Sequence, residues 1–230
     1  MAKMLCGIKE MKKILVLIKK DVFLMDMYAY FTLMVLIGIP LFMCGSLKTM
    51  AYPLYTLFLS LDYAAFFAFS QLYTMESKFK GQTYIMACPF LRRQIIEARF
   101  VLLMIICVIG TVFYKLAELI NPAHLFDGIS RLNLYDALIA VSLIVILYDV
   151  LFLFLNNVPY EKVRVAHIII SIFVPIWGVV LVVKLIQYFG INIELRAPTM
   201  IAAVITVIVT IILTAVSVTK NINIWKKKEF

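Results

Sequence analysis

Residues 135–155 read YDALIAVSLIVILYDVLFLFL, and this stretch decides the fold class of the chain. Apart from its tyrosines, its only polar residues are Asp136, Ser142 and Asp149. A bilayer core about 30 Å thick requires about 20 consecutive, predominantly apolar residues in a helix. The stretch therefore predicts a membrane-spanning helix and not the amphipathic element of a soluble domain.

Five further stretches have a similar length and character, at about 28–47, 53–73, 99–118, 166–187 and 199–219. The composition agrees, because the 230 residues are 64% hydrophobic and their mean hydropathy is +1.02. Soluble domains are much less apolar. We therefore expect an all-α integral membrane protein with six transmembrane helices and no separate soluble domain.

The basic residues predict the orientation of these helices. Most of the 22 Lys and Arg residues precede the first stretch, follow the last, or lie between the second and third or the fourth and fifth. Cytoplasmic loops carry such an excess. Both termini are therefore expected in the cytoplasm, which an even number of spans also requires. The predicted domains are a cytoplasmic N-terminal segment 1–27, a transmembrane domain 28–219 with a cytoplasmic loop 75–98, and a basic tail 220–230.

The N-terminal segment has the pattern of an amphipathic helix. Its lysines fall mostly on one arc, and apolar residues recur at helical spacing on another: Met4, Leu5, Ile8, Met11, Leu15, Ile18 and Val22. This pattern favours a helix that lies in the cytoplasmic membrane interface. The alternative is a basic leader that only sets the orientation.

Two acidic residues lie within predicted spans. Asp62 falls near the middle of the second, beside Tyr63, and Asp149 lies in the inner half of the fourth. A carboxylate at the bilayer centre costs roughly 2.5–3.5 kcal/mol, so it should face protein or water. Asp62, Tyr63 and Asp149 are therefore candidates for a translocation route or a contact between subunits. For Asp62 the alternative is a protonated or hydrogen-bonded core acid beside Tyr63 or Ser60.

The residues that catalysis or metal binding would need are not grouped in the sequence. There is no glycine-rich phosphate loop, so this chain cannot hydrolyse ATP by that route. The only histidines are His124 and His167, and the four cysteines are scattered. We expect no enzymatic activity, no metal site and no cofactor in this chain, and no motif for binding nucleic acid.

The loop from Glu76 to Arg99 is more patterned than a connector needs to be. Tyr84, Ile85 and Cys88 can form a small apolar face on a short helix, which Pro89 would end before Arg92 opens the next span. Such a helix suits insertion into a groove on a cytosolic motor protein. A loop helix that rests on lipid headgroups is an equal reading of the residues alone.

This loop resembles that of bacterial ABC-2 type permeases, in which acidic and basic residues precede an aromatic helix and a Pro-x-x-Arg turn. The matching positions are Glu76, Lys78, Tyr84, Pro89, Arg92, Ile95, Arg99 and Phe100, and the segment 159–164 also resembles the family. The chain departs from the pattern at Gly81, where a Trp is common, and at Cys88, where a Leu commonly precedes the proline.

The resemblance implies the membrane subunit of an ATP-binding-cassette exporter in the bacterial cytoplasmic membrane. A second permease chain, identical or not, and cytosolic subunits that bind ATP and Mg would complete it. Small members of the family often export amphipathic peptides or confer immunity to antimicrobial ones. The coupling residues implied are Glu76, Lys78, Tyr84, Ile85, Cys88, Pro89 and Arg92. The rival functions are a self-sufficient secondary transporter or channel, which should carry several titratable groups at mid-depth, and a membrane scaffold or sensor, which would not need the patterned loop.

Overall fold

The computed structural model describes the backbone of residues 2–25, 27–46, 53–78, 92–120, 132–157 and 200–227, and the single positions 162, 165, 167 and 169. The regular elements in these ranges are all α-helices: α1 (Ala2–Met25), α2 (Met27–Ser46), α3 (Pro53–Lys78), α5 (Arg92–Ile120), α6 (Leu134–Asn157) and α8 (Met200–Lys227). No strand occurs in this part of the chain. The predicted all-α class is confirmed for it.

Four of these helices contain segments long and apolar enough to cross a membrane: Pro53–Met75, Gln94–Leu119, Leu134–Leu155 and Met200–Ile224. They coincide with four of the six predicted stretches, to within about five residues at each end. Both ends of the predicted cytoplasmic loop 75–98 are helical, because α3 continues to Lys78 and α5 already begins at Arg92. Hydropathy detects only the apolar part of a helix, whereas its backbone hydrogen bonds continue into polar sequence.

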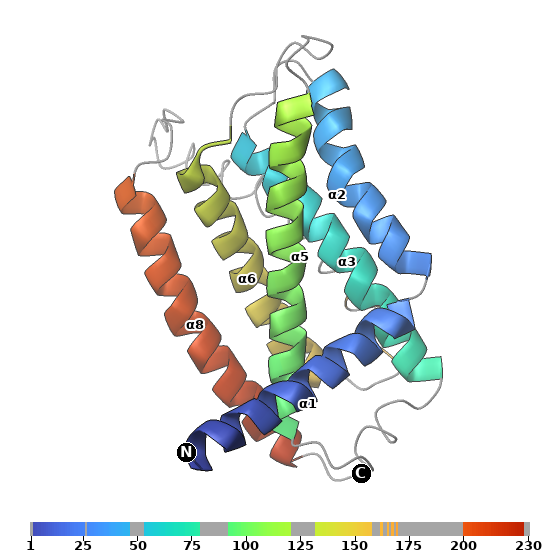
Figure 1. Cartoon of the computed structure of the whole chain (residues 1–230), viewed down its shortest axis with the longest axis vertical. Coiled ribbons are helices and arrows are strands. Elements are labelled where there is room, and N and C mark those ends of the chain that lie inside the picture. The colour runs from blue at the N-terminus through green and yellow to red at the C-terminus, as the bar shows by residue number, and fades with distance from the viewer. Residues whose placement is uncertain are drawn as a thin grey trace.

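The predicted first span corresponds to α2, which runs at a steep angle to α1. The segments Met11–Met25 and Tyr28–Gly38 meet at 86°, and if they are counted as one bent span the described residues hold up to five spans. Figure 1 shows α1 crossing the lower end of the bundle while α2 runs along it. The predicted fifth span, 166–187, lies outside the described residues except for positions 167 and 169. The six-span topology therefore stays a prediction.

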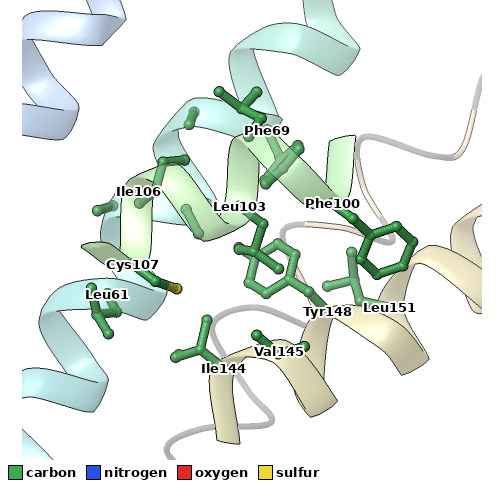
Figure 2. Close-up of a cluster of buried hydrophobic side chains, with 14 of the residues drawn as sticks. Leu61, Phe69, Phe100, Leu103, Ile106, Cys107, Ile144, Val145, Tyr148 and Leu151 are labelled. Carbon is green, nitrogen blue, oxygen red and sulfur yellow. The ribbon is translucent and has the colours of Figure 1, made fainter. Parts of the chain in front are cut away.

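The core of the bundle lies between α3, α5 and α6. Figure 2 shows side chains from the three helices meeting there: Leu61, Phe69, Phe100, Leu103, Ile106, Cys107, Ile144, Val145, Tyr148 and Leu151. The Phe152 ring lies edge-on to both Phe69 and Phe100, with 5.2 Å between centroids in each pair. Lipid tails are as apolar as these side chains, so close van der Waals packing holds the helices together.

One close approach depends on glycine. A Cβ atom at Gly110 of α5 would overlap the Leu61 side chain of α3 and would lie 2.8 Å from Cδ2 of Leu36 in α2. Both leucines are almost fully buried, so their side chains have little room to move. Gly110 therefore lets three helices meet at one point.

The outermost described helix is α8, which packs mainly against α6 and stands at the edge of the bundle (Figure 1). Only 17% of its membrane segment is buried. Its exposed side chains are almost all apolar, as in Ile201, Ile208 and Ile211. This composition suits contact with lipid.

Candidate functional site

The helix ends that flank the predicted coupling loop lie at one end of the bundle. Figure 1 shows the end of α3, the start of α5 and the end of α8 at the lower end, where α1 crosses. Glu76 and Lys78 fall in the last turn of α3, and Arg92 is the first residue of α5, but their side chains are outside the described set. Tyr84, Ile85, Cys88 and Pro89 lie outside the described residues altogether. Their coupling role stays a prediction.

Asp62 lies inside the bundle and not against lipid. Its side chain on α3 is almost completely buried, and its Oδ1 atom has no hydrogen-bond partner in the described part of the chain. The Ser60 hydroxyl donates to the Leu36 carbonyl oxygen of α2, at 3.4 Å, and not to Asp62. Tyr63, the next residue, is half-buried. Asp62 is thus a buried acid with one carboxyl oxygen unsatisfied among the described residues.

Asp149 joins α6 to α8 through a polar cluster, which we call the α6–α8 clasp (Asp149, Thr214, Ser217 and Asn221). The Thr214 hydroxyl donates to Oδ2 of Asp149 at 2.7 Å, and the Ser217 hydroxyl donates to the Asp149 carbonyl oxygen at 3.0 Å. The Asn221 amide donates to the Ser217 hydroxyl at 3.3 Å. The Oδ1 atom of Asp149 is buried without a partner among the described residues.

An apolar groove of about 530 Å³ lies between α5, α6 and α8. Its lining residues are Met104, Leu138, Val141, Ser142, Val145, Val207, Thr210, Ile211, Thr214 and Ala215. Along α6 the lining ends at Val145, one turn before Asp149, and Thr214 belongs to both the groove and the clasp. The clasp therefore adjoins one end of this largely apolar groove. Asp62, on α3, belongs to a different place in the bundle.

Sequence reasoning missed the surroundings of His167. This side chain is fully buried, and neither ring nitrogen has a hydrogen-bond partner among the residues that the structure describes. Its ring stacks on Phe66 at 5.4 Å between centroids, and Tyr73 and Tyr148 lie edge-on to it. The sequence signal available was the spacing of seven residues that places Phe66 and Tyr73 on one face of α3. Their partner His167 lies about one hundred residues further along the chain, and no local sequence pattern predicts this contact.

A second polar group ties α5 to the segment before α6. Nζ of Lys115 lies 2.8 Å from Oε2 of Glu118 and donates to the Leu132 carbonyl oxygen at 2.5 Å. The Leu132 amide donates to Glu118 at 3.2 Å. These contacts link the last turn of α5 to Leu132, two residues before α6 begins.

The described residues contain no group of three or more His, Cys, Asp or Glu side chains that could hold a metal ion. What the described part offers is a multi-helix membrane bundle with buried acids and helix ends gathered at one end.

A family model described as ABC-2 family transporter protein matches residues 16–226. This range runs from the middle of α1 almost to the end of α8. No curated protein and no solved structure matches the chain.

Proposed function

The chain belongs to the ABC-2 family of transporter proteins, and from that premise we propose that it is the permease subunit of an ATP-driven exporter. The observation that carries the proposal is the family match, which extends over nearly the whole helical bundle. Such permeases are membrane components of transporters and normally work with an ATP-binding subunit. This chain, which has no phosphate loop, would receive its energy from that partner.

The proposed contact with the ATP-binding subunit is the segment between α3 and α5. Tyr84, Ile85 and Cys88 would enter a groove on the partner, and Glu76, Lys78 and Arg92 would contact its rim. Two facts support this assignment: α3 and α5 end and begin at the same end of the bundle, and both enter the packed core. Because both helices are continuous, a push on the segment between them would move the core as a unit.

The proposed transport route lies between this chain and a second permease chain, identical or related. Spans one, two and five would line it, and Asp62 and Tyr63 on α3 would contribute polar groups. The proposed cargo is an amphipathic peptide, such as an antimicrobial one, and the proposed direction is export from the bacterial cytoplasm. A route at a subunit boundary is supported by the apolar outer surface of α2, where Tyr30, Phe31 and Met34 are at least half exposed.

The decisive experiment is retention of the ATP-binding subunit by a tagged permease in detergent. Tyr84→Asp would bury an unpaired charge in the proposed contact. Loss of such a central contact costs about 2–4 kcal/mol, or roughly thirtyfold to a thousandfold in affinity. The variant should insert and fold normally, yet lose the ATPase and its transport-stimulated hydrolysis.

Lys80→Ala is the matched control, because Lys80 lies on the polar side of the same predicted helix. It should retain the ATPase. Full retention by Tyr84→Asp would refute the coupling contact, and a wild-type protein that never binds an ATPase would refute the proposed function itself.

A further inference from the structure

Helix α1 has a side that packs on the bundle and a side that nothing in the described part covers. Leu17, Ile18, Asp21 and Met25 are buried, and α1 packs against α5 and α3. The other side exposes Met11, Leu15, Val16, Val22 and Phe23, and the Phe23 side chain is 82% exposed. A soluble surface seldom carries so many apolar side chains together. The exposed side therefore requires an apolar or amphiphilic partner.

The charge on this exposed side has one sign. Lys12, Lys13 and Lys19 are exposed. Asp21 is the only acid between residues 11 and 25, and it is buried, with its Oδ1 atom 2.7 Å from Nζ of Lys20. Over these residues the uncovered surface thus combines apolar side chains with exposed positive charge.

The position of α1 fits a partner that lies in the plane of the membrane. Because Met11–Met25 meets Tyr28–Gly38 at 86°, α1 runs along the bilayer surface when α2 crosses the bilayer. A helix with lysines and large apolar side chains on its free side is typical of the lipid interface. The lysine stems can lie along the acyl chains while their ammonium groups reach the headgroups.

We propose that the exposed side of α1 is a binding surface for anionic phospholipids, with Phe23 inserted among the acyl chains and Lys12, Lys13 and Lys19 on the headgroups. Each lysine near an anionic membrane is attracted to it, and the attractions of the three lysines add. Together they should make binding of anionic lipid tighter than binding of zwitterionic lipid by on the order of a hundredfold. Since α1 also packs against α3 and α5, the helices that flank residues 79–91, the lipid bound to α1 would help to set their position. This inference does not depend on the proposed coupling to an ATPase.

The test uses the full-length protein reconstituted in phosphatidylcholine, with Phe23→Trp in a background where Trp177 and Trp225 are replaced by Phe. Phospholipids with brominated chains and either a phosphatidylglycerol or a phosphatidylcholine headgroup are then added. We expect both brominated lipids to quench the fluorescence of the new Trp. Brominated phosphatidylglycerol should do so at a roughly hundredfold lower fraction of the total lipid than brominated phosphatidylcholine. High salt should remove most of this preference, because it screens exposed charges.

Two triple variants separate charge from shape. Replacing Lys12, Lys13 and Lys19 with Gln should bring the two lipids to nearly equal quenching, whereas replacing them with Arg should keep the preference. Equal quenching by both headgroups in the unmodified lysine background would overturn the proposal. The proposal would also be overturned if neither brominated lipid quenched the Trp at position 23, or if this Trp became shielded from water only when a cytosolic protein was bound.

Discussion

Thr214→Val tests the α6–α8 clasp, the polar contact that holds the outermost described helix. The substitution removes the hydroxyl that donates to Oδ2 of Asp149 at 2.7 Å and keeps the branched shape of the side chain. The Asp149 side chain is 2% exposed, and its Oδ1 atom has no partner in the described part. The variant therefore removes one hydroxyl donor from a buried carboxyl group.

Two known ranges of hydrogen-bond energy bound the loss of stability expected from Thr214→Val. Hydrogen bonds between transmembrane helices average about 0.6 kcal/mol and reach about 1.7 kcal/mol, because the unfolded chain in the membrane also finds partners. Hydrogen bonds to charged groups in soluble proteins are worth about 1.5–3 kcal/mol. Since the carboxyl group is buried and already has one unsatisfied oxygen, we expect a loss near the upper membrane value. The free energy of unfolding should fall by about 1.5 kcal/mol, or roughly tenfold in the unfolding equilibrium.

The assay is unfolding of the purified protein in mixed micelles, followed by circular dichroism as the denaturing detergent increases. Thr206→Val is the matched control, because the Thr206 hydroxyl donates to Ala202 of its own helix and not across the interface. Its effect should stay within about 0.5 kcal/mol, as for substitutions away from such contacts. In an Asp149→Leu background, Thr214→Val should cost almost nothing, since the two residues act as a pair.

Equal losses for Thr206→Val and Thr214→Val would refute this reasoning, because the interhelical bond would then contribute nothing specific. A full loss from Thr214→Val in the Asp149→Leu background would also refute it. In that case the cost would come from packing in the groove and not from the hydrogen bond.

The other predictions concern the buried acid of α3, the glycine contact and the orientation. Asp62→Leu should alter transport and leave subunit assembly intact; a higher Tm with unchanged transport would make Asp62 a tolerated core acid. Gly110→Ala should lower the free energy of unfolding by about 1–3 kcal/mol through overpacking. The control Gly38→Ala, at a position with open space around it, should raise the free energy of unfolding by up to about 1 kcal/mol. Equal effects of the two substitutions would contradict the close packing at Gly110. In a cysteine-free background, Lys78→Cys should react only with cytoplasmic reagent and Asp127→Cys only with external reagent, and the reverse pattern would overturn the orientation.

Much of the fold could be predicted because a bilayer constrains each helix separately. An apolar length near 20 residues is a local property, so residues 53–73 and 135–155 predicted spans that the described helices reproduce. The helix ends were less predictable. The helices α3 and α5 extend into the predicted loop 75–98, because helices continue past the apolar segment.

The candidate site was only partly visible in the sequence. Asp62 and Asp149 stood out because a carboxylate is costly in a membrane, and both are buried. The hydrogen-bond partner of Asp149 could not be predicted, since Thr214 lies 65 residues away. Nothing in the local sequence distinguishes Thr214 from the other threonines of α8. The choice between Thr206 and Thr214 depends on the rotation and depth of α8 against α6.

The sequence by itself determined the membrane class, four described spans, the charge asymmetry and a family that the match over residues 16–226 supports. These follow from composition and from patterns within single segments. Tertiary structure alone decided the angle of 86° between α1 and α2, the stacking of His167 on Phe66 and the α6–α8 clasp. Each of these depends on how one helix is turned and positioned against another, and hydropathy along a single segment carries no information about that relation.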